Sequence, residues 1–115
     1  MLKWYKKLYI GDNAKKKAPA VIKKINQGKL QYDIYLITLA SNEKNLLEII
    51  QANQLAQKTL RKLCPMIVGL AAGYTEALEV VEKIVEETYQ KQGNTDVRRY
   101  LEERLTEENK SEVGE

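Results

Sequence analysis

The strongest constraint on the fold is a near-continuous apolar run, PMIVGLAA at residues 65–72, followed directly by a long amphipathic pattern. A short run of this kind is typical of a buried strand, most often in a parallel sheet. Apolar side chains then recur at about 3.6-residue spacing opposite an acidic face, which predicts a helix. The apolar positions are Ala77, Leu78, Val81, Ile84, Val85 and Thr88.

Two further strands are predicted upstream. In residues 3–11 aromatic and aliphatic side chains alternate between two faces with lysines among them, which favours an edge strand because lysine commonly protects sheet edges. Residues 31–41 carry apolar groups on both faces, with Ile34, Leu36 and Thr38 on one and Ile37 on the other. This pattern predicts a strand that is covered on both sides.

Helical spacing connects these strands. Residues 18–28 carry a helical stripe with a proline in the first turn and Gly28 at the end. Residues 42–63 carry an imperfect stripe, which predicts one helix or two short ones broken near Ala52–Asn53. A last helix begins at Asp96, a suitable N-cap, with Val97, Tyr100, Leu101 and Leu105 on one face.

Strands and helices therefore alternate along the chain, which predicts an α/β domain. We expect a small, three-stranded, mostly parallel sheet flanked by three to four helices in two or three layers. The 115 residues are enough for one domain, which we place at residues 1–105, followed by a mobile acidic tail at 106–115.

The composition narrows the function classes. The chain has no histidine and one cysteine, which removes Ser–His and Cys–His nucleophile pairs and the usual zinc sites. We therefore expect no metal and no cofactor, and a binding protein rather than an enzyme. The lone cysteine, the absence of an apolar run of ~18 residues and the absence of a signal-peptide pattern favour a cytoplasmic protein.

Charge is unevenly distributed. Residues 1–30 hold nine lysines and one acid, Asp12, whereas residues 76–115 hold six bases and twelve acids. The layout indicates an anionic partner or two ends that attract each other. Lysines mixed with aromatic residues are typical of single-strand binders, but also of a solvated edge. The candidate polyanion-binding residues are Lys3, Lys6, Lys7, Lys15, Lys16 and Lys17.

The carboxyl ends of the strands are the second candidate site, because ligands of open parallel sheets bind there. Three polar turns follow the predicted strands and would converge at one edge. Their side chains are Asp12, Asn13, Ser41, Asn42, Tyr74 and Thr75. This arrangement predicts a small-molecule site, or equally a set of helix caps.

The glycines of the apolar run do not form a phosphate loop. Gly69 and Gly73 are spaced G-x-x-x-G, and Tyr74-Thr75 stands where a P-loop needs Lys-Ser/Thr. Glu76 lies in the first helical turn, where its charge repels an anion. We expect Gly69 to let the helix approach the strand, Gly73 to cap the helix, and Glu76 to bond back to the cap.

Three segments, LYIGDNAKKK, YLITLASNEKNLLEI and IVGLAAGYTEALEVVEKIVEETYQKQG, resemble a group of small bacterial α/β proteins with no assigned activity. The resemblance covers most of residues 8–101 and implies a stand-alone domain without catalytic residues to carry over. The function expected is a non-catalytic binding or regulatory domain acting through surface contacts. Its partner would be another protein or a second copy paired through an edge strand. The alternatives are polyanion or single-stranded nucleic-acid binding through the lysine-rich stretch, and small-molecule binding or an enzyme site at the carboxyl ends of the strands.

Overall fold

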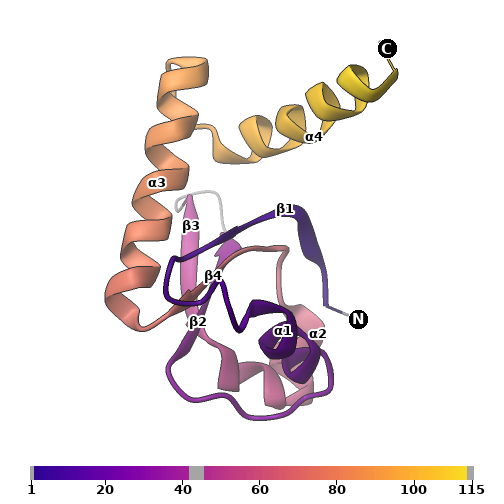
Figure 1. Cartoon of the computed structure of the whole chain (residues 1–115), viewed down its shortest axis with the longest axis vertical. Helices are drawn as coiled ribbons and strands as arrows, with labels where there is room; N and C mark the ends of the chain where they lie inside the picture. The colour runs from indigo at the N-terminus through magenta and orange to yellow at the C-terminus, as the bar shows by residue number, and fades with distance from the viewer. Residues whose placement is uncertain (1, 42–45, 114–115) are drawn as a thin grey trace.

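The computed structural model describes residues 2–41 and 46–113, of which 107–113 are described by their backbone alone. Within these residues four strands form one sheet, accompanied by four α-helices and one 3₁₀ helix (Figure 1). In chain order the elements are β1 (Trp4–Ile10), α1 (Ala18–Asn26), β2 (Ile34–Leu39), β3 (Leu47–Gln51), η1 (Ala52–Ala56), α2 (Lys58–Leu63), β4 (Ile67–Ala72), α3 (Tyr74–Gln92) and α4 (Val97–Val113).

The sheet is mixed and mostly antiparallel. Its strand order is β1-β4-β2-β3, and only the β1–β4 pair is parallel. The predicted α/β class is confirmed, but the prediction of a three-stranded, mostly parallel sheet is wrong. The apolar run of β4 indicates a strand that is buried on both faces. A strand can be buried in this way whether its neighbours run parallel or antiparallel to it, so the run does not predict their direction.

The missed strand lies inside the segment predicted as helix, residues 42–63. There β3 pairs with β2 over five consecutive residues, from Leu47 opposite Leu39 to Gln51 opposite Tyr35. The helical reading rested on the apolar spacing of Leu46, Ile49 and Ile50, but a strand with apolar groups on both faces produces the same spacing. The prediction of one helix or two is therefore wrong for this half, and only the second half, η1 and α2, is helical.

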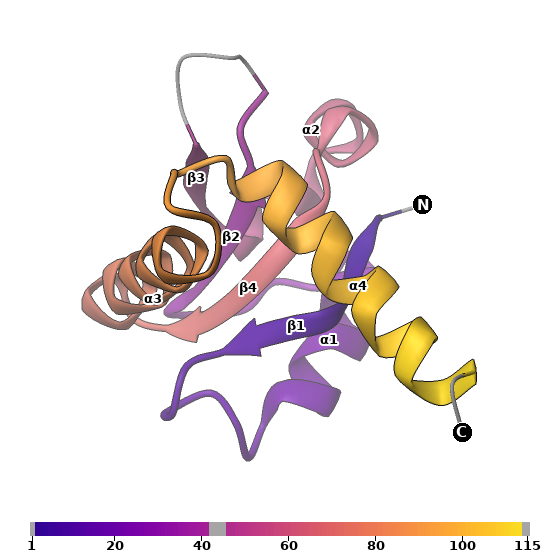
Figure 2. The same cartoon turned by 90° about the horizontal axis from the view of Figure 1, so that it is seen from above.

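Two apolar cores lie on opposite faces of the sheet, which makes three layers. Tyr5, Tyr9 and Ile37 pack with α3 and α4 on one face. Leu36 and Ile67 pack with α1 and η1 on the other. Figure 2 shows α4 crossing in front of the strands and α1 behind β1. The predicted alternation of side chains along β1 and β2 is confirmed, as is the edge position of β1.

Helix α3 packs closely on the sheet at Gly69. A Cβ atom there would lie 3.0 Å from Val80 and 3.1 Å from Ile37, so the glycine allows the close approach that was predicted. Gly73 is the N-cap with φ 94°, a conformation that glycine adopts without strain. The buried face of α3 includes Val80 rather than Leu78, which is 47% exposed.

Helix α4 begins at the predicted N-cap, where Asp96 Oδ1 accepts the backbone N–H of Arg99 at 3.3 Å. Arg98 donates to the carbonyl of Ala40, which joins α4 to the end of β2. The helix continues to Val113 and so enters the segment 106–115, whose mobility stays a prediction. Among the described residues, no helix has both the length and the apolar character needed to cross a bilayer.

Candidate functional site

The predicted crevice at the strand ends does not assemble as expected. Strands β1 and β4 are parallel, so the turns after Ile10 and Ala72 lie at the same end of the strands. Strand β2 runs in the opposite direction, which places Ser41 at the other end, beyond the hydrogen bond from the Leu39 N–H to the carbonyl of Met66. Asn42 lies outside the described residues.

A carboxylate of the chain itself, that of Glu76, lies between the turn that follows β1 and the start of α3. Glu76 is 7% exposed, and its two oxygens accept the backbone N–H groups of Asn13 at 2.9 Å and Ala72 at 3.0 Å. The Glu76 side chain lies so close to Gly11 that a Cβ on Gly11 would be 2.1 Å from Glu76 Oε1. Glu76 bonds the residue before the cap rather than the cap itself, and its charge excludes a phosphate from these donors.

The other predicted site residues at this end of the strands have exposed side chains. Asp12 forms a surface ion pair with Lys15 at 3.1 Å, and its side chain is 93% exposed. Tyr74 packs edge-on against Tyr35 with ring centroids 5.6 Å apart. Thr75 is exposed in the first turn of α3. Asn13 therefore meets Glu76 through its backbone, and the remaining side chains stay apart.

A cavity lies elsewhere, between α2 and the sheet. It has a volume of about 320 Å³, within the range of ligand pockets in proteins. We call it the α2 pocket. Its walls are Ile50, Leu55, Leu60, Leu63 and Pro65, and its polar groups are Thr38, Ser41, Glu48, Gln54 and Cys64.

Thr38 is the distinctive polar group of the α2 pocket. It is fully buried on β2, and its hydroxyl has no hydrogen-bond partner among the described residues. Buried hydroxyls are normally paired, and each such exception requires an explanation. Ser41 lies at the rim, where its hydroxyl donates to Glu48 Oε1 at 3.2 Å. Apolar walls with a few polar groups are the usual composition of a small-molecule site.

The thiol in the α2 pocket is not activated. Burial raises the pKa of Cys64, and its Sγ donates to the carbonyl of Pro65 at 3.3 Å. A protonated thiol is a poor nucleophile, since the thiolate is the reactive form. Within the part of the chain that the structure describes, no three acidic or cysteine side chains gather as a metal site. The arrangement can bind a molecule by shape and hydrogen bonds.

Sequence reasoning found Ser41 but missed most of the α2 pocket. Thr38 shares its predicted face of the strand with Ile34 and Leu36, and a lone hydroxyl on that buried face is the signal in the sequence that points to it. The pocket residues on η1 and α2 could not be predicted, because the sequence pattern before them favours a helix where the structure has β3.

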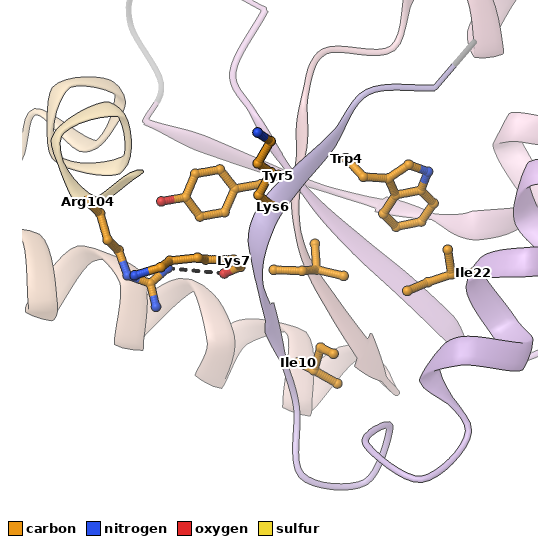
Figure 3. A pocket seen from close by; sticks show the side chains of 8 residues that line it. Trp4, Tyr5, Lys6, Lys7, Ile10, Ile22 and Arg104 are labelled. Carbon is orange, nitrogen blue, oxygen red and sulfur yellow. Dashed lines mark hydrogen bonds between the residues drawn. The ribbon is translucent and has the colours of Figure 1, made fainter. Parts of the chain in front are cut away.

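The lysine-rich candidate divides into two groups. Lys3, Lys6 and Lys7 lie on or beside β1, whereas Lys15, Lys16 and Lys17 lie in the turn after it. Lys6 and Lys7 line an open groove of about 570 Å³ along the outer side of β1, together with Trp4, Ile22 and Arg104 (Figure 3). Arg104 reaches from α4 to the carbonyl of Lys7 at 3.1 Å.

Beside this groove, a polar network holds α4 to the sheet and to α3. The hydroxyls of Tyr9 and Tyr100 both donate to Glu87 Oε2. The Arg104 guanidinium lies 4.5 Å from the centre of the Tyr9 ring. Burial would raise the pKa of Glu87, but the hydrogen bonds from Tyr9 and Tyr100 and the charge of Arg104 lower it overall. Every polar group named here has a partner within the protein, so the network is a structural clamp.

The class that fold and site define is a three-layer α/β domain with a cavity between sheet and helix. Comparison with protein-family models, with curated proteins and with solved structures found no match to the chain.

Proposed function

We propose that the protein is a non-catalytic binding domain and that the α2 pocket takes a small, largely apolar molecule bearing one hydrogen-bonding group. The observation that carries the proposal is Thr38, a residue that lines the pocket and whose buried hydroxyl has no hydrogen-bond partner among the described residues. Leaving such a group unpaired costs about 1–3 kcal/mol. A ligand that pairs with it recovers that free energy and gains from burial of its own apolar surface.

The charge of the α2 pocket narrows the ligand class. Glu48 is the acid among its lining residues, and it already accepts hydrogen bonds from Ser41. A carboxylate at the rim disfavours an anionic ligand and favours a donor. The chemistry that fits is a neutral ring or short chain with an O–H or N–H group, such as a phenol.

The probes for this proposal are 4-methylphenol and toluene, which differ by one hydroxyl. We expect 4-methylphenol to bind more tightly, with the largest amide chemical-shift changes at Thr38, Ile50 and Cys64 in heteronuclear NMR spectra. Thr38→Val removes the hydroxyl at nearly constant volume. It should abolish the preference between the two probes while retaining toluene binding.

The matched control is Thr88→Val. Thr88 is equally buried, but its hydroxyl is paired with the carbonyl of Ile84 at 2.7 Å and lies on the opposite side of the sheet. This variant should bind both probes as the wild type does. Absence of shifts around the α2 pocket with either probe, or an unchanged preference in Thr38→Val, contradicts the proposal.

Polyanion binding is the second candidate, favoured by the location of the basic residues. Nine lysines fall on β1, α1 and the loops beside them, with Asp12 the single acid in residues 1–30. Trp4 donates to Asn26 at 2.8 Å, which joins the start of β1 to the end of α1. The two elements therefore lie side by side, and we call residues 3–29 the basic corner, where phosphate contacts would give affinity without sequence choice.

A further inference from the structure

The two edges of the sheet are built differently. β1 carries Lys3, Lys6 and Lys7 on or beside it, its register against β4 slips between Trp4 and Tyr9, and Arg104 binds the carbonyl of Lys7. Lysines and bulges are the usual devices that prevent an edge strand from pairing with another chain. Among the described residues, β3 has none of these features: its five residues keep an unbroken register with β2 and include a single charge, Glu48.

The hydrogen bonds of β2 show which backbone groups of β3 point outward. The carbonyl of Asp33 and the N–H of Leu39 bond to Gly73 and Met66, so odd-numbered residues of this segment face β4. Backbone groups alternate along a strand, so Leu36 and Thr38 face β3, where they pair with Ile50 and Glu48. The backbone groups of Leu47 and Ile49 therefore point away from the sheet.

The side chains of β3 are apolar on both faces and incompletely covered. Leu47 and Ile49 are half-buried at the margin of the core under α3 and α4, whereas Ile50 lies at the margin of the other core. Any strand added here becomes part of a three-layer structure. It must therefore bring apolar side chains on both faces and helices of its own to cover them.

We propose that a second copy of this chain occupies this edge. Two β3 strands pair antiparallel about a two-fold axis at Ile49 and join the sheets into one of eight strands. β3 meets the requirement by itself, because it is apolar on both faces and belongs to a domain with helices on both sides. Closed two-fold pairing is also the commonest way for a chain to bind itself.

Charge supports this register. With Ile49 opposite the partner subunit's Ile49, Glu48 lies opposite the partner subunit's Ile50, and Leu47 lies opposite the partner subunit's Gln51. The strand therefore pairs with itself without placing its one acid directly across from its own copy, a pairing that would be unfavourable. Flanking this edge, Val81 and Val85 of α3 border the same core as Leu47 and Ile49, and they continue the incompletely covered apolar surface.

Sedimentation of the purified full chain is the first test. At tens of micromolar the protein should sediment at twice the 13.2 kDa of one chain. Ile49→Lys places a charge at the proposed axis and should reduce the mass to that of a monomer. Leu8→Lys, at a half-buried position on β1, is the matched control and should remain dimeric. A wild-type monomer across this range overturns the proposal.

A cross-link tests the register without depending on the stability of a lysine variant. In a Cys64→Ser background, Ile49→Cys places two thiols opposite each other across the axis. Directly hydrogen-bonded antiparallel residues have Cα atoms about 5.5 Å apart, within disulfide range. Mild oxidation should convert most of this variant to a covalent dimer and leave Leu8→Cys largely monomeric. Equal cross-linking of both variants overturns the assignment to β3, whatever the α2 pocket binds.

Discussion

At the scale of single residues, the sequence predicted one property of Glu76, its exclusion of a phosphate, but not its hydrogen-bond partners. Its place in the first turn of α3 excluded a phosphate loop, and the structure shows its carboxylate on the N–H groups of Asn13 and Ala72 instead. The reach to Asn13 spans 63 positions of the chain and could not be read from the helix pattern. Glu76 thus joins the end of β1 to the start of α3.

Replacement of this carboxylate should weaken the fold. Glu76→Ala leaves two backbone donors without their acceptor, and each hydrogen bond to a charged group contributes about 1.5–3 kcal/mol. We expect the free energy of unfolding in urea to fall by about 3–6 kcal/mol for the two bonds together. The exposed Glu79→Ala in the same helix is the control, with a change below about 0.5 kcal/mol. Equal losses in the two variants would show that the Glu76 contacts contribute nothing.

Tyr100 makes stability depend on alkaline pH. Burial and the hydrogen bond to Glu87 raise its pKa from 10.0 to about 12. Between these pH values the folded protein keeps the Tyr100 proton, whereas the unfolded chain releases it. The contribution of Tyr100 to stability is therefore fully present below pH 10 and is lost as pH rises through about 12. Burial also raises the pKa values of Tyr5 and Tyr9, so Tyr100→Phe should reduce this fall in stability without removing it, measured as urea unfolding from pH 9 to 11.5. Tyr32→Phe, at an exposed ring, is the control, and an equal change in both variants would exclude this explanation.

At the scale of elements, α2 and α3 differ in how they are held. α2 has six residues, none of them buried, whereas α3 buries Ala77, Val80, Ile84 and Thr88. A helix of one to two turns is unstable by itself, so its stability comes from packing. α2 also forms one wall of the α2 pocket, and its Arg61 donates to the carbonyls of Ile25 at 2.8 Å and Leu55 at 3.3 Å, so polar contacts rather than buried side chains hold it.

The difference predicts separate opening. Amide protons of α2 should exchange with solvent at least about tenfold faster than those of α3, because local opening follows burial. Leu60→Ala should cost less than about 1 kcal/mol, whereas Ile84→Ala, at a fully buried site, should cost about 2–5 kcal/mol. Exchange is read by NMR and stability by urea unfolding. Similar protection in both helices would show that α2 is held by more than the described contacts.

At the scale of the whole molecule, the basic corner and the acidic helices lie on different elements. If the corner binds polyanions, the wild type should be retained on heparin and released as salt rises, because binding releases counterions. Lys15→Ala/Lys16→Ala/Lys17→Ala should elute at lower salt. Lys62→Ala/Lys83→Ala/Lys91→Ala removes the same charge from α2 and α3 and serves as the control. If both triple variants elute together, net charge alone accounts for the retention.

Most elements could be predicted because side-chain spacing is a local property. β1, α1, β2, β4, α3 and α4 fall where the alternating and helical periods place them, and the faces of β1 and β2 point to the expected sides. The exception was Leu47–Gln51, whose five residues fit either period. This segment is a strand because it pairs with β2, and that pairing depends on residues outside the segment itself.

The amino-acid sequence by itself determined where chain segments bury apolar surface, where α3 and α4 begin, and that histidine chemistry is absent. Only the tertiary structure decided strand order and direction, because a buried strand has the same composition whichever way its neighbours run. That choice separated Ser41 from Asp12 and Thr75, and it brought Thr38 of β2 beneath α2. A site is made by side chains that meet in space, and here the contacts that form it depend on an antiparallel pairing that local periodicity does not encode.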